Sequence, residues 1–499
     1  MASPPVPPSP VSSAAFPPIP LSALVEVAPG AETRGDPAVS ILDVAYDSRV
    51  VQTGSLFFCV PGASIDGHAF ARDALDAGAA ALVVERWLEV PAPQVRVPSV
   101  REAMGPISAR AFRDPAGAMT MLGVTGTNGK TTVTYLLEAI VRRAGARPGV
   151  IGTTGARVDG DAVPLERTTP EAPDLHRLLA RMRERGVGVV AMEVSSHALE
   201  QHRAGGVLFD AVAFTNLSQD HLDYHASMED YYAAKAELFT PSHARAGIVN
   251  ADDEWGRRLI GDARIPVSTF AVEGEADLRA ADVAISPSGL GFTAGGLRFG
   301  SSLRGSFNVS NCLAAIALAR AGGVADEAIV EGIADVGEVP GRVEPIDEGQ
   351  EFLVMVDYAH TPDSILGVLQ ATRPLASGRL IVVFGCGGDR DRAKRPLMGK
   401  AATSTADLTI VTTDNPRSED PLAIIAEIEP GAAEGGGAYV IEPDRRAAIA
   451  RAVAEARPGD AVVIAGKGHE HQQELGDRTI EFDDRDEARR ALRSAGGRS

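Results

Sequence analysis

The 499-residue chain has few cysteines and no long apolar run, and each absence excludes a class of protein. Its three cysteines, Cys59, Cys312 and Cys386, stand far apart and show no metal-ligand spacing. So few thiols are typical of a reducing compartment rather than of a disulfide-bonded secreted protein. No apolar stretch approaches the roughly 20 residues that span a bilayer. We therefore expect a cytoplasmic protein without membrane insertion.

Basic residues are also scarce relative to acidic residues, 48 Lys and Arg against 67 Asp and Glu, for a formal net charge of −19. A nucleic-acid surface needs clustered basic residues to meet phosphates, so nucleic acid is not expected as a partner. The N-terminus, MASPPVPPSPVSSAAFPPIP, lacks the basic and apolar regions of a secretory signal. Its Pro, Ser and Ala content predicts a disordered tail over residues 1–20.

The length and a hydrophobic content of 44% predict a globular protein of about three domains. The first domain is expected over residues 21–117 and ends at a linker, Asp114-Pro115-Ala116-Gly117. The second is expected over residues 118–341 and the third over residues 342–499. Both alternate apolar strand patterns with helix patterns, which predicts an α/β fold with mostly parallel sheets. The expected strands are 119–124, 188–192, 380–384, 408–412 and 461–464, short apolar runs stand at 56–60, 80–84 and 211–214, and the expected helices are 131–145, 175–185, 306–321 and 445–456.

A glycine-rich turn joins the expected strand 119–124 to the next helix. It reads Gly126-Thr127-Asn128-Gly129-Lys130-Thr131-Thr132. At such a turn, backbone N–H groups and the helix N-terminus bind phosphates, a lysine reaches the terminal phosphates, and a hydroxyl such as that of Thr131 ligates Mg²⁺. The strict pattern has glycine where this chain has Val124. An ordinary glycine turn would not explain Lys130 at the helix start, so the turn predicts nucleotide binding.

Three other residues could serve this loop, and each also has a plainer interpretation. Glu193 follows the expected strand 188–192, at the edge where α/β sheets bind ligands, so it is either a Mg²⁺ ligand or a solvated glutamate. His221 is either a metal ligand or a packed core histidine, and its pattern alone favours the core. Lys235 lies in the amphipathic segment 231–239 and would ordinarily be a surface lysine.

Many ordered motifs together resemble the Mur ligase family. They are GTNGKTT, EVSSHALEQHR (193–203), TNLSQDHLDYH (215–225), YYAAKAELF (231–239), PGRVE (340–344), VDYAHTPDS (356–364), FGCGGDRDRAKRPLM (384–398), DNPR (414–417) and AGKGHE (465–470). The resemblance extends from about Asp47 to Glu470. It implies an N-terminal nucleotide-substrate domain, a central P-loop domain and a Rossmann-like C-terminal domain.

The resemblance also implies roles for individual residues. ATP would contact Gly126, Thr127, Asn128, Gly129, Lys130, Thr131, Thr132, Asn308 and Arg342, with Asp357 near its ribose. Glu193 and His221 would hold Mg²⁺, and Lys235 would be carbamylated so that its carbamate can ligate the metal. The UDP-sugar dipeptide would contact Ser48, Thr168, Thr169, Ser195, Gln201 and Arg203. The incoming amino acid would contact Arg390, Asp414, Asn415, Pro416, Arg417, Gly466 and Glu470.

The activity implied by the resemblance is an ATP-dependent ligation in peptidoglycan precursor synthesis, carried out by a monomer. The reaction adds meso-2,6-diaminopimelate to UDP-N-acetylmuramoyl-L-alanyl-D-glutamate through an acyl phosphate. The alternative amino acid is L-lysine, which lacks the distal carboxylate of diaminopimelate. Arg417 favours diaminopimelate because a guanidinium pairs bidentately with a carboxylate. A plainer interpretation is that Arg417 only braces its loop.

Three other classes of protein share some of these features. A folylpolyglutamate synthetase shares the phosphate loop and the carbamylated lysine, but the segments 193–203 and 414–417 disfavour it. A P-loop switch or motor would normally hold its metal with a strand-end aspartate, whereas this chain offers Glu193 and His221. A scaffold without catalysis would have no need of Lys130, Glu193, His221 and Lys235 together.

Overall fold

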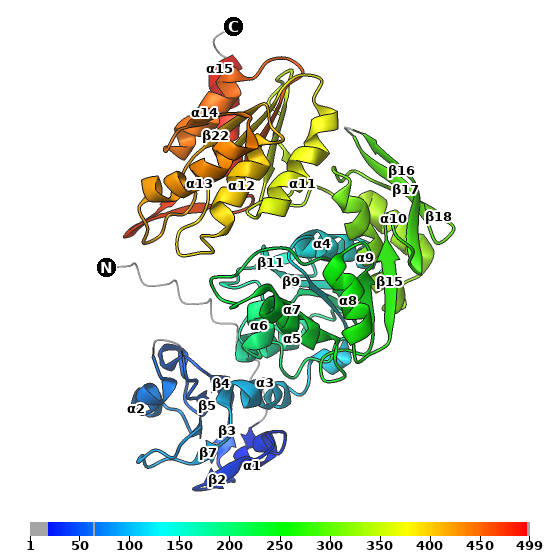
Figure 1. Cartoon of the computed structure of the whole chain (residues 1–499). Coiled ribbons are helices and arrows are strands. Elements are labelled where there is room, and N and C mark those ends of the chain that lie inside the picture. Colours follow the sequence, from blue (N-terminus) through cyan, green and yellow to red (C-terminus); the bar gives the residue numbers. More distant parts are fainter. Residues whose placement is uncertain (1–17, 63–64, 287, 497–499) are drawn as a thin grey trace.

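The computed structural model describes residues 18–62, 65–286 and 288–496, which are arranged as three parts, each around its own main β-sheet (Figure 1). The N-terminal and C-terminal parts lie at opposite ends of the molecule, with the central part between them (Figure 1). The predicted α/β fold with three domains is confirmed. Of the predicted tail, residues 1–17 lie outside the described residues. Disorder was wrong for Ile19 and Pro20, because this strand, β1 (Ile19–Pro20), pairs with β3 (Ser40–Ile41).

The N-terminal sheet has the strand order β2-β7-β6-β5-β4, and only β2 and β7 pair antiparallel. Its strands are β2 (Glu32–Arg34), β4 (Asp43–Ala45), β5 (Ser55–Phe58), β6 (Ala81–Val84) and β7 (Gln94–Arg96), and its helices are α1 (Leu21–Val25), α2 (Ala71–Asp76) and α3 (Val100–Ala111). Every residue of β5 and β6 is buried, since apolar clusters cover both faces of the sheet.

The central sheet has the order β11-β10-β9-β12-β8-β13-β14-β15-β16-β17-β18, and neighbouring strands from β9 to β16 are parallel. The strands are β8 (Thr120–Thr125), β9 (Pro148–Gly152), β10 (Gly155–Val158), β11 (Asp161–Val163), β12 (Val189–Glu193), β13 (Ala211–Phe214), β14 (Gly247–Asn250), β15 (Val267–Ala271), β16 (Leu278–Ser286), β17 (Gly289–Ala294) and β18 (Leu297–Ser301). The helices are α4 (Lys130–Arg143), α5 (Ala172–Glu184), α6 (Ser196–Glu200), α7 (Met228–Ala236), α8 (Glu254–Asp262), α9 (Phe307–Ala321) and α10 (Asp326–Asp335). Helices α4, α9 and α10 supply one apolar cluster, and α5 and α7 supply another.

The C-terminal sheet has the order β19-β20-β24-β21-β22-β23 and is parallel except at β19. Its strands are β19 (Glu344–Pro345), β20 (Leu353–Asp357), β21 (Leu380–Phe384), β22 (Leu408–Val411), β23 (Ala438–Ile441) and β24 (Ala461–Ala465), and β25 (Gln472–Leu475) and β26 (Arg478–Glu481) form a separate hairpin. Helices α11 (Pro362–Thr372), α12 (Lys394–Thr403) and α13 (Pro421–Gly435) supply one apolar cluster. The helices α14 (Arg445–Glu455) and α15 (Asp484–Gly496) supply the other.

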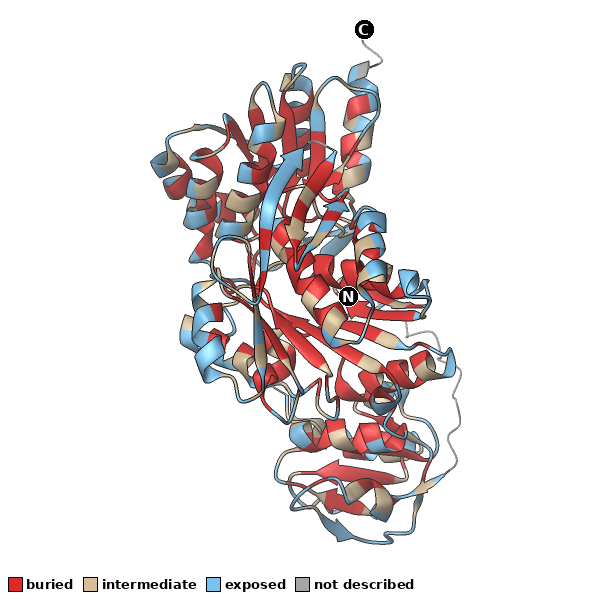
Figure 2. Cartoon of the chain, turned by 90° about the vertical axis from the view of Figure 1, so that its right-hand side faces the viewer, coloured by how far each residue is buried: buried red, intermediate tan, exposed pale blue. Residues whose placement is uncertain are grey.

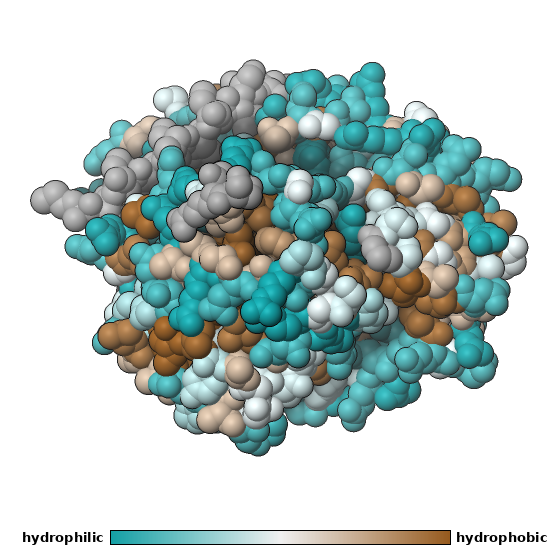
Figure 3. All heavy atoms as spheres, turned by 90° about the horizontal axis from the view of Figure 1, so that it is seen from above, coloured by the Kyte–Doolittle hydropathy of each residue, from teal (hydrophilic) through white to brown (hydrophobic). Residues whose placement is uncertain are grey.

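The burial pattern explains why the strand predictions were reliable in these parallel sheets. In Figure 2 the inner strands of the parallel sheets are buried along most of their length, while the helices alternate buried and exposed residues, and strands such as β2 and most of β16 are exposed. Strands covered on both faces are continuous apolar runs, which a sequence shows directly. The surface is more polar than these buried strands: Figure 3 shows a mainly hydrophilic face with separate hydrophobic patches. Within the described residues, no helix has both the length and the apolar character that a bilayer crossing requires.

Contacts link the three parts to one another. Tyr46 Oη of the N-terminal part donates to Asp174 of α5 at 2.8 Å. At the other end, Arg342 Nη2 donates to Thr131 Oγ1 at 3.2 Å, which connects the C-terminal part to the phosphate loop. The predicted boundaries at residues 117/118 and 341/342 lie between the main sheets and stay predictions.

A fully buried ion pair joins α14 to α15. The side chains of Arg445 and Asp484 are both 0% exposed, and Arg445 donates through Nε and Nη2 to the two carboxylate oxygens at 2.8 and 2.6 Å. Replacing Arg445 with methionine leaves Asp484 as an unpaired buried charge, so we expect a loss of about 3–5 kcal/mol in the free energy of unfolding. Urea and thermal denaturation measure this change.

The matched control is the double variant Arg445→Met/Asp484→Leu, which removes both charges. It should recover most of the stability, because two well-packed apolar side chains can replace a buried ion pair at little cost. A double variant as unstable as Arg445→Met alone would contradict the electrostatic explanation.

Candidate active site

The phosphate loop lies between β8 and α4, as predicted, and its backbone is tightly enclosed. Gly126 has φ 141° and Gly129 has φ 92°, values that side chains other than glycine rarely adopt. A Cβ at Gly126 would lie 2.0 Å from Thr215 Oγ1, and one at Gly129 would lie 2.3 Å from Asn311 Oδ1. The loop therefore presents bare backbone at the N-terminus of the 14-residue helix α4, which favours anions.

Two lysine amines meet at this loop. Lys130 Nζ donates to Gly126 O at 3.0 Å and to Thr127 O at 2.9 Å, and Lys235 Nζ donates to the same Gly126 O at 2.9 Å. Lys235 is 1% exposed, so the interpretation as a surface lysine is wrong. Burial and then the charge of Lys130 hold the pKa of Lys235 well below its usual value. Within the described residues no carboxylate forms an ion pair with either amine.

Glu193 and His221 flank the same loop. Glu193 is the last residue of β12 and is 1% exposed, which rules out a solvated glutamate. Its carboxylate accepts hydrogen bonds from Thr153 N at 3.0 Å and Thr153 Oγ1 at 2.9 Å. The side chain of His221 is 36% exposed, so it is not a packed core histidine. Loss of hydration lowers the pKa of His221 to about 3, and a neutral imidazole is the form that ligates metals.

A buried carboxylate beside His221, which the sequence analysis did not select, joins two parts of the molecule. Asp220 Oδ2 lies 3.4 Å from His221 Nε2 and 3.5 Å from His360 Nε2. Asp220 Oδ1 accepts a hydrogen bond from Lys394 Nζ of α12 at 3.1 Å. His360 and Lys394 belong to the C-terminal part, so Asp220 holds that part against the phosphate loop. Among the described residues no group of three or more His, Cys, Asp or Glu is placed to hold a metal.

The other residues expected at the nucleotide lie in different surroundings. Arg342 reaches Thr131, as described above, and its guanidinium stacks on Tyr358 at 4.6 Å. Asn308 Nδ2 donates to Arg304 O at 2.6 Å, and Asn308 Oδ1 accepts from Asn311, the residue that packs against Gly129. Both oxygens of Asp357 accept backbone N–H groups, from Val343 and Ala359, at 2.7 Å. Those bonds give Asp357 a structural role in its loop.

Five of the residues expected to bind the UDP-sugar dipeptide form a connected polar network. Thr169 Oγ1 donates to Glu193 O at 2.9 Å, and Ser195 N donates to Thr169 Oγ1 at 3.2 Å. Arg203 Nη2 donates to Gln201 Oε1 at 2.6 Å. Thr168 Oγ1 reaches Thr153 Oγ1 at 3.1 Å, which adds it to the group around Glu193. Ser48 stands on the N-terminal part, in the short turn Ser48–Val50.

An ion-pair cluster that the sequence analysis missed supports this network. Glu171 is buried and lies 3.1 Å from Arg203, 3.2 Å from Arg101 and 3.5 Å from Arg167. One carboxylate thus serves three guanidinium groups, and the cluster has surplus positive charge. Arg101 belongs to α3, so the cluster spans the N-terminal and central parts beside residues expected to bind an anionic substrate.

The residues expected at the amino acid gather around the loop 414–417. Asn415 Nδ2 donates to Glu470 Oε2 at 2.9 Å, and a Cβ at Gly466, whose φ is 118°, would lie 3.1 Å from Asp414 Oδ2. Pro416 O lies against Gly388, where a Cβ would come within 1.9 Å. Arg390 is exposed and donates to Asp389 O, and no contact within the described residues joins it to this group.

The Arg417 guanidinium stabilises its loop through two of its nitrogens and, among the described residues, leaves the third without a partner. Its Nη1 donates to Gly388 O at 2.8 Å, and its Nε lies 3.0 Å from Glu474 Oε2. Within the described residues Nη2 has no hydrogen-bond partner. The backbone of Arg417 has φ 51° and that of His221 has φ 56°, and such non-glycine residues often occur at functional sites.

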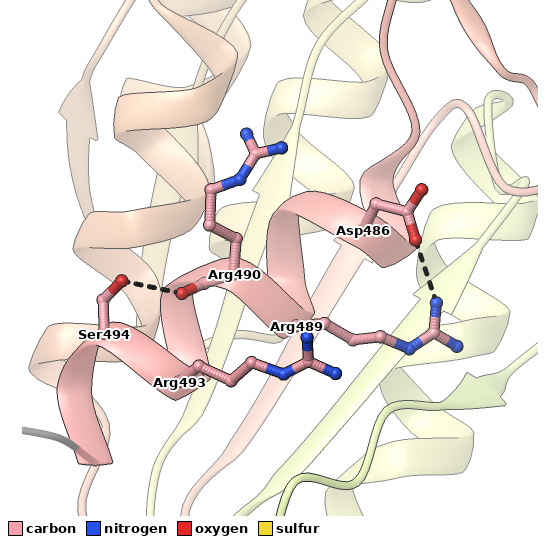
Figure 4. Close-up of a pocket in the computed structure, with 5 residues that line it drawn as sticks. All are labelled: Asp486, Arg489, Arg490, Arg493 and Ser494. Carbon is pink, nitrogen blue, oxygen red and sulfur yellow. Dashed lines mark hydrogen bonds and ion pairs between the residues drawn. The ribbon is translucent and has the colours of Figure 1, made fainter.

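A separate hollow of about 530 Å³ lies on α15, away from the phosphate loop (Figure 4). It is lined by Asp486, Arg489, Arg490, Arg493 and Ser494. Its arginines are already paired, Arg489 with Asp486, Arg490 with Glu487, and Arg493 with Glu348. The hollow therefore has no uncompensated charge with which to select a ligand.

Family models match the three parts of the chain in order. "Mur ligase family, catalytic domain" matches residues 41–112, "Mur ligase middle domain" matches residues 124–319, and "Mur ligase, glutamate ligase domain" matches residues 341–468. The chain belongs to the Mur ligase family. This confirms the family that the sequence motifs resemble.

The curated relatives of this Mur ligase match it over nearly its whole length. A protein of Streptomyces coelicolor is 45% identical over 510 residues, which cover 99% of each chain. One of Geobacillus thermodenitrificans is 45% identical over 470 residues, covering 92% of this chain and 96% of the relative. Both are named UDP-N-acetylmuramoyl-L-alanyl-D-glutamate--2,6-diaminopimelate ligase.

Solved structures also resemble this Mur ligase. A structure of a ligase with that same name is 35% identical, has a TM-score of 0.69, and the match covers 96% of this chain and 99% of the other. A MurF ligase of Thermotoga maritima in complex with ADP is 18% identical with a TM-score of 0.62, covering 92% and 98%. A folylpolyglutamate synthase of Mycobacterium tuberculosis is 19% identical with a TM-score of 0.58, covering 72% and 91%, and shares the fold alone.

Proposed function

We propose that this Mur ligase adds meso-2,6-diaminopimelate to UDP-N-acetylmuramoyl-L-alanyl-D-glutamate at the expense of ATP. The observation that carries the proposal is the phosphate loop, where the half-buried Lys130 amine and the buried Lys235 amine share one carbonyl oxygen, close to the inter-part contact at Asp220. Near-full-length relatives named for this reaction support it. We further propose a cytoplasmic monomer, with the part boundaries at residues 117/118 and 341/342.

The chemistry begins with a carboxylate, which is a poor electrophile. Transfer of the terminal phosphoryl group of ATP to the dipeptide carboxylate gives an acyl phosphate, and attack by the amine then forms the amide and releases phosphate. Both steps place negative charge on oxygens. The amides of residues 126–132, the ammonium of Lys130 and the guanidinium of Arg342 are proposed to stabilise that charge. Asn308 and Asp357 are proposed to position the nucleotide.

Lys235 is proposed to be carbamylated. Its amine is buried and shares Gly126 O with Lys130, and a neutral amine is the form that attacks CO₂. A bond forms between Nζ and the carbon of CO₂, one proton leaves to solvent, and the product is a carbamate with one negative charge. The change replaces a neutral buried amine with an anion that can pair with the ammonium of Lys130.

A Mg²⁺ site is proposed at Thr131, Glu193, His221 and the carbamate of Lys235. The residues fit a hard cation, because they would supply carboxylate, carbamate and hydroxyl oxygens with one neutral imidazole. Glu193 and His221 alone are too few, so the carbamate and phosphate oxygens complete the set. When bound, Mg²⁺ would neutralise the phosphate oxygens during transfer.

The UDP-sugar dipeptide and the amino acid are assigned to two separate groups of residues. The UDP-sugar dipeptide is proposed to contact Ser48, Thr168, Thr169, Ser195, Gln201 and Arg203. The surplus positive charge around Glu171 suits that anionic substrate. The amino acid is proposed to contact Arg390, Asp414, Asn415, Pro416, Arg417, Gly466 and Glu470, where Arg417 Nη2 is available for the distal carboxylate.

The choice between diaminopimelate and L-lysine tests the function. Lysine leaves the Arg417 guanidinium without its carboxylate, so wild type should prefer diaminopimelate by at least about thirtyfold in kcat/KM, since an unpaired charge in such a site costs about 2–5 kcal/mol. Arg417→Ala should remove most of that preference. The measurement is phosphate release with UDP-N-acetylmuramoyl-L-alanyl-D-glutamate and each amino acid.

The matched control is Arg417→Lys, which keeps the charge and loses the planar fork. It should retain part of the preference, because a lysine ammonium pairs with a carboxylate without bidentate geometry. If wild type uses lysine as well as diaminopimelate, or if Arg417→Ala leaves the preference unchanged, Arg417 is only a brace for its loop.

A further inference from the structure

Lys467 is a buried lysine in the segment 465–470 to which the sequence analysis gave no role. Its side chain is 0% exposed. Its Nζ donates to Asn415 Oδ1 and to Glu470 Oε2, both at 2.9 Å, and lies 3.6 Å from Asp414 Oδ1. These three partners come from two segments far apart in the sequence, and all three are proposed to bind the amino acid. Lys467 therefore connects the loop 414–417 to Glu470 within the proposed amino-acid site.

The bonds of Lys467 determine which way the Asn415 amide faces. Asn415 Oδ1 accepts from the Lys467 ammonium and from Glu474 N at 3.1 Å, so Nδ2 is directed to Glu470 Oε2 at 2.9 Å. Lys467 and Asn415 thus both donate to the same oxygen, Oε2. Within the described residues Oε1 of Glu470 accepts no hydrogen bond. A carboxylate that is fixed through one oxygen keeps the other for a ligand ammonium.

The charges of this group also suit a cationic ligand. Asp414 and Glu470 contribute two negative charges and Lys467 contributes one positive charge, which leaves one net negative charge. Two guanidinium groups are also nearby: that of Arg445 is paired with Asp484 through two hydrogen bonds, and that of Arg417 lies 3.0 Å from the Glu474 carboxylate. Without Lys467, the carboxylates of Asp414 and Glu470 would repel each other with no ammonium between them, and Glu470 would keep only its hydrogen bond from Asn415.

We propose that Lys467 is a positioning residue of the amino-acid site, which orients Asn415 and Glu470 to receive the distal ammonium of the incoming diamino acid. It acts through those two side chains and does not touch the reacting atoms. The inference rests on the proposed function, because it concerns how the same site binds the same amino acid.

The test is the variant Lys467→Met, which keeps an unbranched side chain that is one atom shorter and removes its charge. The KM for diaminopimelate should rise by about tenfold to a hundredfold, the range expected when one partner of a buried charge pair is truncated. The KM values for ATP and for UDP-N-acetylmuramoyl-L-alanyl-D-glutamate should change by less than about twofold, since their sites do not contact Lys467. The exposed Lys400 of α12, replaced with methionine, is the matched control and should leave all three values unchanged.

A double-mutant cycle separates positioning from simple structural support. In a Glu470→Gln background, where the carboxylate is already lost, Lys467→Met should raise the KM for diaminopimelate by less than about threefold further. A structural role would instead add its full cost in both backgrounds. If Lys467→Met lowers the thermal midpoint so far that kinetics fail, Lys467→Gln retains a donor without the charge and should show the same selective rise in KM.

Two results would overturn the inference. One is an unchanged KM for diaminopimelate in both Lys467 variants. The other is an equal rise in all three KM values together with full additivity in the cycle. Failure of the proposed function is distinguishable from either, because it would show in the wild type as an absence of ligation with diaminopimelate.

Discussion

Lys130→Ala is expected to abolish ligation while the protein stays folded. The Lys130 ammonium donates only to two carbonyl oxygens of its own loop, so little of the fold depends on it. With ATP bound, the Lys130 ammonium is proposed to meet the terminal phosphates. Losing such a group typically costs about 10²–10³ in kcat. Phosphate release and amide formation measure the loss, and the thermal midpoint measures the folding.

The matched control for Lys130→Ala is Lys400→Ala, which removes an exposed lysine paired with Glu434. Its activity should equal that of the wild type. Retention of more than about a tenth of wild-type activity in Lys130→Ala would refute the assignment, because no charge-stabilising group of that kind is so dispensable.

The second variant with a large expected effect is Lys235→Ala, and we expect a small carboxylate to restore part of its activity. The variant should lose activity by at least about a hundredfold, because the site loses an anionic metal ligand. A short-chain carboxylate such as formate or acetate should restore part of the activity by supplying the missing oxygens. The measurement is phosphate release as a function of carboxylate concentration.

Lys130→Ala provides the control for this rescue, since a carboxylate cannot replace a cation and should restore nothing. Wild type depleted of CO₂ should lose activity and regain it with bicarbonate. A high-resolution electron-density map that shows a bare ammonium at Lys235, at neutral pH with bicarbonate present, would contradict the carbamate.

The sequence predicted those features of the fold that depend on neighbours along the chain. The strand before the phosphate loop, β8, and the helix after it, α4, both lie where the apolar patterns placed them. The helix expected over residues 445–456 is α14, and it begins after Asp444, whose side chain accepts from Ala447 N. Such signals are local, because a strand covered on both faces and a capped helix start depend on adjacent residues.

The features that the sequence pattern missed depend on residues far apart in the chain. Lys235 looked like a surface lysine, and only Gly126, more than a hundred residues away, reveals that it is buried. Lys467 gave no signal because its partners Asn415 and Glu470 come from separate segments. The family motifs selected Lys235 as a site residue, which stays a prediction, but they could not give the contacts that bury it.

The hairpin β25–β26 determines what can be exchanged at the amino-acid loop. Gln473 Nε2 donates to Asp414 O at 2.7 Å, Glu474 pairs with Arg417, and Leu475 forms a backbone bridge with Arg417. The four residues 414–417 are therefore only half of a unit whose other half lies about sixty residues further along the chain. Transplanting those four residues alone between relatives would separate each from its support. If the loop 414–417 binds the amino acid as proposed, its specificity depends on the loop and the hairpin together. A substitution in one would then require a matching substitution in the other.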